Sequence, residues 1–380
     1  MKAKTIKGKS PEEIKNALTD SLSDGYKPTL AIVFMSFKLD IDAVCELLYK
    51  EGIQIFGATS SGEFISSEIE EKSIVVMLLD IVPSYFKLLF LEVGDRSDFE
   101  IAKQLGEEGK KTFENAAFII TTGWSNKMDG EEIIRGIEEG FGGGATIFGG
   151  MAGDDLTLTG PKAFTWGKSS TTGLVALIID EDKIALSGVA TCGWKAIGIT
   201  KTITKSEGNV VYTIDDKPAL DLVMKYLGLD LEEQVNNTVF NLGAYYPLQL
   251  EREGAPAVMR TAQMGNIEDR SLICAGNVPQ GSKVRFSLPP DFDVIDTVVE
   301  ECTEVKEKQL QDADAVIMFS CISRYLSFGV MTSEEIEQVQ AVWNAPMIGF
   351  FTYGEYGKAR EGKHEFHNNT CCVLALKEKK

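Results

Sequence analysis

Three loops in this sequence combine glycine with a carboxylate, and each loop follows an apolar run. Residues 56–64 read Phe-Gly-Ala-Thr-Ser-Ser-Gly-Glu-Phe, and residues 348–356 read Ile-Gly-Phe-Phe-Thr-Tyr-Gly-Glu-Tyr. In both, a Ser or Thr stands three residues after a glycine, and a second glycine, a glutamate and an aromatic residue follow it. Residues 148–156, Phe-Gly-Gly-Met-Ala-Gly-Asp-Asp-Leu, are a looser third version. The repetition predicts a duplicated structural unit and a binding site built from its loops.

Glycine and a carboxylate in one loop suit the recognition of a positively charged ligand. Glycine adopts positive φ without steric cost and lets a ligand approach the backbone closely. A carboxylate accepts hydrogen bonds from an ammonium group, and open α/β sheets bind ligands at the carboxyl ends of their strands. We therefore predict that one or more pockets are lined by Ser60, Gly62, Glu63, Gly150, Gly153, Asp154, Asp155, Tyr353, Gly354 and Glu355. The alternative is that each carboxylate accepts N–H groups of its own turn.

An amino-acid ligand also needs a partner for its own carboxylate, and a guanidinium meets a carboxylate with two parallel hydrogen bonds. Arg324, just past an apolar run, is the first candidate and Arg260 is the second, although each could instead form a structural ion pair. Cys321 lies beside Arg324 and is the one thiol that this charge could activate; the alternative is a small buried residue. His367 and Asn368 are predicted as hydrogen-bonding pocket residues, with His367 as a general base in an enzyme reading.

An enzyme is the alternative class. The two histidines, His364 and His367, stand three residues apart and could bind a metal with a loop carboxylate, as in a metal-dependent hydrolase. Their segment is more typical of a loop or strand, in which residues three apart point to different faces. The sequence contains no Gly-x-Ser-x-Gly, no Walker A motif and no dinucleotide fingerprint. We predict no catalytic residue, no bound metal and no cofactor.

The loops belong to a unit of strand, helix, strand, acidic loop and strand, which occurs three times. The first two strands and the helix between them are expected at 30–34, 40–51 and 53–57, then at 117–121, 129–141 and 145–148, and finally at 315–320, 333–343 and 347–350. The strands are unbroken apolar runs, as in sheets that are buried on both faces. The sequence predicts a mixed α/β fold (α+β) with mixed sheets covered by helices, and a layered α-β-β-α arrangement is one option.

Residues 193–288 have a different pattern, with short strands, turns and one helix at 216–227 that Gly228 would end. A long surface helix is expected at 291–312. The boundary between two parts therefore falls near residues 191–194, which gives regions 1–192 and 193–380.

The composition of the chain limits the kinds of partner that it can bind. The chain has 380 residues, of which 44% are hydrophobic and 25% charged, and a formal net charge of -19, which disfavours nucleic acid and anionic membranes. No apolar run approaches the roughly 18–20 residues that span a bilayer, and we recognise no secretory signal. The seven cysteines lack a C-x-x-C spacing, which indicates reduced thiols. We expect a cytoplasmic protein with a small-molecule ligand and no membrane insertion.

Several motifs together resemble the FIST domain family, with an N-terminal FIST region in 1–192 and a C-terminal one in 193–380. Beside the three loops, the resemblance rests on Asp-Asp-Lys-Pro-Ala-Leu at 215–220, Gly-Asn-Val-Pro-Gln-Gly at 276–281, Phe-Ser-Cys-Ile-Ser-Arg at 319–324 and Phe-His-Asn at 366–368. They occur in the family's order over nearly the whole chain. Ala58 stands where related sequences often have Cys, which weakens the idea of a thiol nucleophile in the first loop.

The resemblance implies a sensory role in signal transduction, with small ligands such as amino acids. Related chains often carry an output module, and we expect this one to signal through a separate protein. The leading hypothesis is thus a non-catalytic sensor of a small polar ligand such as an amino acid. A metal-dependent hydrolase that uses the acidic loops and His367 is the first alternative, and a protein–protein adaptor is the second.

Overall fold

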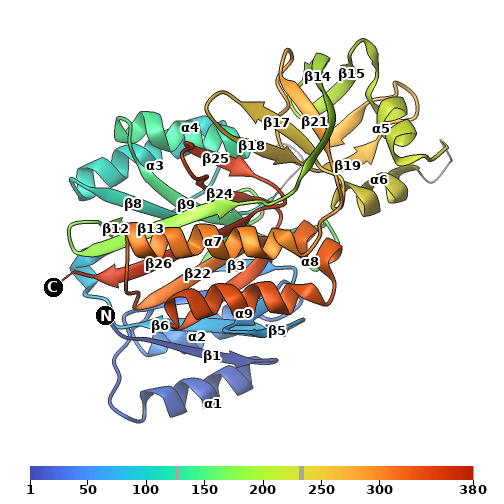
Figure 1. The fold of residues 1–380 in the computed structure, drawn as a ribbon. Helices are drawn as coiled ribbons and strands as arrows, with labels where there is room; N and C mark the ends of the chain where they lie inside the picture. The colour runs from blue at the N-terminus through green and yellow to red at the C-terminus, as the bar shows by residue number, and fades with distance from the viewer. Residues whose placement is uncertain (125–127, 231–234, 380) are drawn as a thin grey trace.

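The computed structural model describes residues 1–124, 128–230 and 235–379, and Figure 1 shows the fold. It is a mixed α/β fold, as predicted. None of the described helices is long and apolar enough to cross a membrane.

Three copies of one unit make up the larger part of the molecule. Unit 1 comprises β1 (Ala3–Gly8), α1 (Pro11–Leu22), β2 (Leu30–Ser36), α2 (Ile41–Lys50), β3 (Gln54–Ser60), β4 (Glu63–Ile65), β5 (Glu68–Glu70) and β6 (Ile74–Leu79). After the short 3-10 helix η1 (Pro83–Tyr85), unit 2 comprises β7 (Phe86–Leu91), α3 (Asp98–Thr112), β8 (Ala116–Thr122), α4 (Gly130–Phe141), β9 (Thr146–Met151), β10 (Ala163–Thr165), β11 (Lys168–Ser170) and β12 (Leu174–Asp180). Unit 3 comprises β13 (Ile184–Thr191), α7 (Asp293–Lys308), β22 (Ala315–Cys321), α8 (Ile322–Phe328), α9 (Met331–Trp343), β23 (Met347–Thr352), β24 (Glu355–Lys358), β25 (His364–His367) and β26 (Cys371–Glu378).

The three units share one sheet pattern. Two parallel strands lie side by side in each (β2 and β3, β8 and β9, β22 and β23), and an antiparallel closing strand (β6, β12, β26) pairs with the first of them. A hairpin from a different unit pairs with the second. Hairpin β4–β5 of unit 1 joins β23 of unit 3, β10–β11 of unit 2 joins β3 of unit 1, and β24–β25 of unit 3 joins β9 of unit 2. The exchange is cyclic, so each unit completes the sheet of another.

Successive side chains of a strand point to opposite faces of its sheet, and this alternation shows where the core lies. Leu30, Ile32 and Phe34 of β2 point to a central core that all three sheets share, whereas Ala31 and Val33 point to the helices of unit 1. Both faces of these strands are buried, so their sequences are continuous apolar runs. They lack the alternation of apolar and polar residues that marks a half-buried strand. Three sheets face this core rather than the two of a layered α-β-β-α arrangement, because the unit occurs three times.

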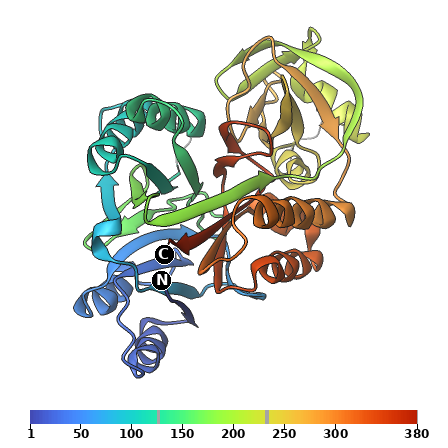
Figure 2. The ribbon, with the colours of Figure 1, turned by 60° about the vertical axis from the view of Figure 1, so that its left-hand side comes forward.

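The remaining residues, 196–287, form an insert domain between β13 and α7 of unit 3. Its elements are β14 (Ala196–Glu207), β15 (Val210–Ile214), β16 (Lys217–Pro218), α5 (Ala219–Leu227), α6 (Val235–Gly243), β17 (Leu248–Arg252), β18 (Ala255–Arg260), β19 (Ala262–Gly265), β20 (Leu272–Cys274) and β21 (Lys283–Ser287). These strands form one antiparallel sheet with its own apolar core. Figure 2 shows the insert domain as a separate lobe beside the ends of the unit sheets.

Candidate ligand-binding crevice

The glutamates of the first and third loops have the same buried arrangement. Glu63 accepts hydrogen bonds from the Ser60 hydroxyl and from the Ser73 hydroxyl at 2.7 Å, with the Ser73 amide at 3.3 Å. Glu355 accepts hydrogen bonds from the Thr352 hydroxyl and from the Thr370 amide at 3.4 Å. Both glutamates are fully buried. The Ser or Thr three residues before each glutamate therefore holds the carboxyl inside its own turn, and neither side chain lines the crevice described below.

Burial changes the ionisation of both glutamates. It raises the pKa of Glu63 to about 7, against the opposing effect of the Ser60 and Ser73 hydrogen bonds. Burial also raises the pKa of Glu355 well above its usual range, although Thr352 and Cys321 hydrogen-bond to it. No basic side chain bonds directly to either group among the hydrogen bonds and ion pairs of the described residues.

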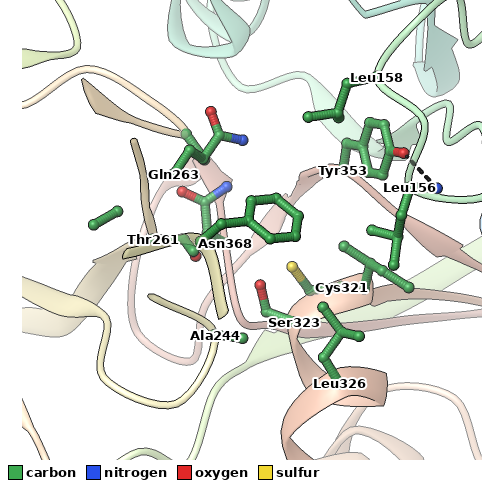
Figure 3. A pocket seen from close by; sticks show the side chains of 14 residues that line it. Leu156, Leu158, Ala244, Thr261, Gln263, Cys321, Ser323, Leu326, Tyr353 and Asn368 are labelled. Carbon is green, nitrogen blue, oxygen red and sulfur yellow. Dashed lines mark hydrogen bonds between the residues drawn. The ribbon is translucent and has the colours of Figure 1, made fainter. Parts of the chain in front are cut away.

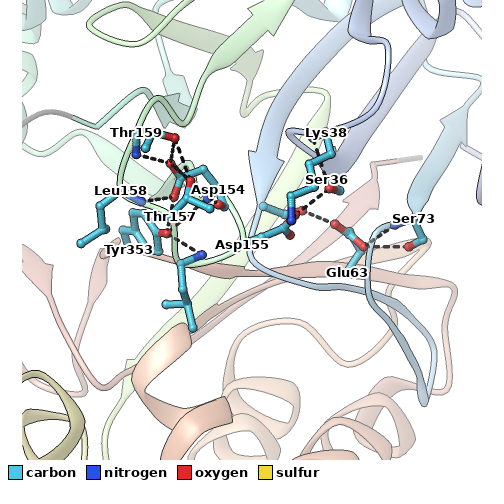
Figure 4. Close-up of polar contacts among 12 residues, drawn as sticks. Ser36, Lys38, Glu63, Ser73, Asp154, Asp155, Thr157, Leu158, Thr159 and Tyr353 are labelled. Atoms are coloured by element: carbon cyan, nitrogen blue, oxygen red, sulfur yellow. Dashed lines mark hydrogen bonds and ion pairs between the residues drawn. The ribbon is translucent and has the colours of Figure 1, made fainter. Parts of the chain in front are cut away.

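The loop of unit 2 is longer and spans residues 152–162. Asp154 accepts hydrogen bonds from the Tyr353 hydroxyl and from the amides of Leu158 (2.9 Å), Thr159 (2.6 Å) and Gly160 (3.0 Å). Burial alone would raise the pKa of Asp154, but these hydrogen bonds outweigh it, and the pKa is lowered. Asp154 thus organises the loop around an ionised carboxylate (Figure 4).

Asp155 points the other way, toward unit 1. Its carboxylate accepts a hydrogen bond from the Ser36 hydroxyl at 2.9 Å and lies 3.5 Å from the Lys38 ammonium (Figure 4). Asp155, Leu156 and Leu158 all have positive φ, a conformation that non-glycine residues adopt rarely. The loop is therefore held in a strained shape by Asp154 on one side and by unit 1 on the other.

A crevice lies where this loop and unit 3 meet the insert domain. Its inner chamber has a volume of about 40 Å³, and Cys321, Tyr353 and Asn368 line it together with Ser323 and Thr261 (Figure 3). Its outer chamber has a volume of about 620 Å³. Four residues line both chambers, so the two are adjacent: Leu158, Phe240, Gln263 and Ala275.

The inner chamber contains a buried acceptor without a partner. Asn368 is 1% exposed; its amide nitrogen donates to the His367 carbonyl at 3.0 Å, but its Oδ1 has no hydrogen-bond partner among the residues that the structure describes. The amide orientation follows from that donor, because a carbonyl oxygen cannot accept from another oxygen acceptor. A buried acceptor left unpaired costs about 1–3 kcal/mol, which a ligand or water with an N–H or O–H group would recover.

Both predicted arginines lie outside the crevice lining and are fully buried. Arg324 pairs with Glu335 and donates to the carbonyls of Cys192 (2.7 Å) and Asn369 (2.9 Å). Arg260 pairs with Glu131 and donates to the carbonyls of residues 259, 277 and 366. Each guanidinium therefore holds separate chain segments together, and the backbone around Asn368 is fixed between them.

His367 is the last residue of β25 and does not line the crevice. Its Nε2 is 3.2 Å from the Gly357 carbonyl, and burial lowers its pKa to about 4. It lines a different cavity of about 150 Å³, together with Arg360 and Glu301. No group of three or more His, Cys, Asp or Glu side chains suited to a metal ion occurs among the described residues.

The predicted glycines serve close packing. An added Cβ would lie 2.8 Å from the Ser61 amide nitrogen at Gly153, 2.2 Å from the Phe366 ring at Gly354 and 2.6 Å from Thr352 at Gly150. Gly62 has φ 120°, and an added Cβ there would lie 2.9 Å from the Phe351 ring. Gly62, Gly150 and Gly153 therefore let segments of different units approach one another, whereas Gly354 makes room for a ring of its own unit.

The cavity lining includes residues that the sequence did not single out. Phe240, Thr261, Gln263 and Ala275 come from the insert domain, and Leu156 and Leu158 come from the long loop. The Asp-Asp-Leu end of the third loop motif was the available signal for Leu156, whereas Leu158 lies beyond that motif. The insert-domain residues carry no local motif, because a partly apolar cavity wall resembles an ordinary core.

The fold and the crevice define a class: an α/β protein of three exchanged units, with a ligand-sized cavity against an inserted lobe. A comparison with protein families then identifies the family. The FIST N domain matches residues 29–217 and the FIST C domain matches residues 219–358, so the chain belongs to the FIST family and the predicted resemblance is confirmed. FIST domains are generally taken as sensory domains that bind small ligands in signalling. No curated protein matches the chain.

Proposed function

We propose that this protein is a sensor whose ligand, a small polar molecule of the amino-acid class, binds in the crevice through an N–H group. The unpaired Oδ1 of Asn368 carries the proposal, because it is a buried acceptor on a residue that lines a cavity. An ammonium or amide group of the ligand would supply the missing hydrogen bond.

The walls fit a ligand with an apolar part. Leu156, Ile322 and Leu326 line the inner chamber beside the polar groups of Ser323 and Asn368. Small-molecule sites typically combine an apolar lining with a few fixed polar groups. The arginines are engaged elsewhere, so the ligand's carboxylate would be met by neutral donors such as the Gln263 amide, or would face the outer chamber.

The long loop offers a path from ligand to partner. Leu156 and Leu158 line the crevice, while Asp155 between them bonds to Ser36 of unit 1. A ligand that moves the leucines would also shift this contact, and a separate signalling protein could read the change. We place the protein in the cytoplasm, in keeping with its seven unpaired cysteines.

Asn368→Ala tests the proposal. Thermal stability and calorimetric titration against the common L-amino acids would identify a binder, because a ligand of the folded state raises the melting midpoint. The substitution should weaken that binder by about tenfold or more, as expected for the loss of one buried hydrogen bond to a charged group. Asn115→Ala is the matched control. Asn115 is exposed and directly precedes β8, at the other end of that strand from Trp124 and the crevice.

Binding that is equal in Asn368→Ala and in the unchanged protein would refute the site. Equal melting midpoints of the two ligand-free proteins would show that the variant is folded. If none of the amino acids binds, the amino-acid class is wrong.

A further inference from the structure

The inner chamber of the crevice is small and its wall is uncharged. Its volume of about 40 Å³ compares with about 30 Å³ for a water molecule in the liquid, so it admits a head group of a few non-hydrogen atoms rather than a whole amino acid. None of the described residues that line it is Asp, Glu, His, Lys or Arg. The polar side chains in its wall are neutral, and they are Thr261, Gln263, Cys321, Ser323, Tyr353 and Asn368 (Figure 3).

Two buried carboxyl groups hydrogen-bond to residues of this wall, and neither is free to pair with a cation. Asp154 accepts the Tyr353 hydroxyl, and the amides of its own loop take its other acceptor positions. Glu355 hydrogen-bonds to Cys321, and burial raises its pKa, which favours the neutral carboxyl group. A positively charged head group would therefore find no counter-ion among the described residues that line the chamber.

The absence of charge in this wall decides which head group can enter. Moving an ammonium group from water into a site without a counter-ion is costly, and one hydrogen bond to a neutral acceptor does not offset that cost. Asn368 is 1% exposed, so water does not screen a charge beside its Oδ1. A neutral N–H donor meets the same acceptor without this cost. Of an ammonium and an amide group, the chamber therefore favours the amide.

A primary carboxamide would use both amide side chains of the wall. Its N–H group would donate to Asn368 Oδ1, and its carbonyl would accept from the side-chain amide of Gln263, which lines the same chamber. Carboxamides pair in this way because each carries two N–H donors and a carbonyl acceptor. A carboxamide is also a head group of the size that the chamber admits.

We infer, on the basis of the proposed function, that the ligand carries a primary carboxamide, as the side chain of glutamine or asparagine does, and that this group occupies the inner chamber. Its N–H group meets Asn368 Oδ1 and its carbonyl meets the Gln263 amide. The charged α-ammonium and α-carboxylate groups stay outside this chamber. The inner chamber then distinguishes amino acids by their side chains, because the α-groups are common to all of them.

Calorimetric titration with a matched series tests the inference: L-glutamine, L-glutamate, L-ornithine and L-norvaline. Their side chains have similar lengths and end in an amide, a carboxylate, an ammonium or a methyl group. L-Asparagine and L-aspartate repeat the comparison with a shorter side chain. An amide should bind about tenfold or more tightly than the others, because norvaline leaves Asn368 Oδ1 unpaired and the charged heads lose water without gaining a counter-ion.

Gln263→Glu tests the other half of the pairing. A carboxylate cannot donate to the amide carbonyl but attracts an ammonium group, so this variant should bind glutamine about tenfold more weakly and ornithine more tightly than the unchanged protein does. Gln311→Glu is the matched control, because Gln311 is exposed just before β22 and the substitution adds the same charge outside the crevice lining. A Gln263→Glu variant that keeps its full affinity for the amide would overturn the inference.

Asn368→Ala separates failure of the inference from failure of the proposed function. Ornithine or norvaline that binds as tightly as the amides, with binding weakened by Asn368→Ala, would leave the crevice site standing and overturn the carboxamide. Amide binding that is equal in Asn368→Ala and in the unchanged protein would overturn both. If no compound of the series binds, the carboxamide class is wrong.

Discussion

Two glutamates that look like ligand-binding groups in the sequence are buried structural groups in the fold. Glu63 and Glu355 each follow a glycine, and each is held by a hydroxyl three residues earlier. The sequence motif thus encodes a local hydrogen bond as well as a tight turn. Spacing alone could not distinguish this arrangement from a pocket, because both need glycine, a hydroxyl and a carboxyl close together.

Glu63 should make stability depend on pH. Its pKa is raised to about 7 in the folded protein, above the value of about 4.3 in an unfolded chain. Between these values the folded state binds one more proton, so stability is highest below the unfolded pKa and falls as pH rises toward 7. The slope from one such group is up to about 1.4 kcal/mol per pH unit.

Glu63→Gln should flatten this dependence between pH 5 and 7, which urea unfolding at a series of pH values would measure. Glu13→Gln is a suitable control, since Glu13 is exposed in the first turn of α1. An unchanged slope in Glu63→Gln would show that the carboxyl is ionised at neutral pH in the folded protein.

At the scale of elements, aromatic rings of the exchanged hairpins pack directly against glycines of the strands that the hairpins join. The rings of Phe64 and Phe164 lie over Gly349 and Gly57, where an added Cβ would come within 2.2 Å of ring carbons. Both rings are fully buried. Gly57 and Gly349 are thus required for close approach rather than for positive φ.

Gly57→Ala should therefore destabilise the protein by about 1–3 kcal/mol, the usual cost of overpacking a core. Gly160→Ala is the control, because its Cβ would meet only a methyl group of Thr171 at 3.5 Å and it lies just before β10, the strand that pairs with β3. The difference in free energy of unfolding between the two variants is the measurement. Equal free energies of unfolding would mean that the Phe164 ring can move away from residue 57 without loss of stability.

Much of the element order could be predicted from the sequence, because buried strands and capped helices carry local signals. The strands of the three units and the helices at 40–51 and 129–141 were expected close to their observed positions. The helix expected at 216–227 begins at Ala219, since residues 217–218 pair with β15 instead. The helix expected at 291–312 ends at Lys308, before the turn into β22.

At the scale of the whole molecule, the hairpin exchange was beyond prediction from one sequence. Phe64 and Gly349 are far apart in the chain, and nothing in either loop indicates which sheet its hairpin joins. The crevice depends on the same long-range packing, because its walls come from the insert domain, the long loop and unit 3. Cys321, Tyr353 and Asn368 were singled out from motifs, but their convergence with Thr261 and Gln263 follows from the fold alone.

Because the β4–β5 hairpin of unit 1 pairs with β23 of unit 3, we expect amides of the two units to be protected from hydrogen exchange together. The Phe351 amide donates to the Gly62 carbonyl at 2.9 Å, and the Ser61 amide donates to the Phe351 carbonyl at 3.2 Å. Both amides should exchange with solvent at similar rates, since both open only when β4 leaves β23. Phe64→Ala should accelerate both in native-state hydrogen exchange. Fast exchange of Ser61 beside a protected Phe351 would contradict the coupling.

The most direct test of a ligand site in the crevice is hydrogen exchange of the full chain with and without a saturating L-amino acid that the titrations show to bind. The account predicts slower exchange in the segments that line the crevice, namely 154–162, 261–265, 321–326 and 366–369. It predicts no change in the cavity beside Arg360 and Glu301. Protection confined to that cavity, or no protection in the crevice segments while the amino acid is bound, would contradict a ligand site in the crevice.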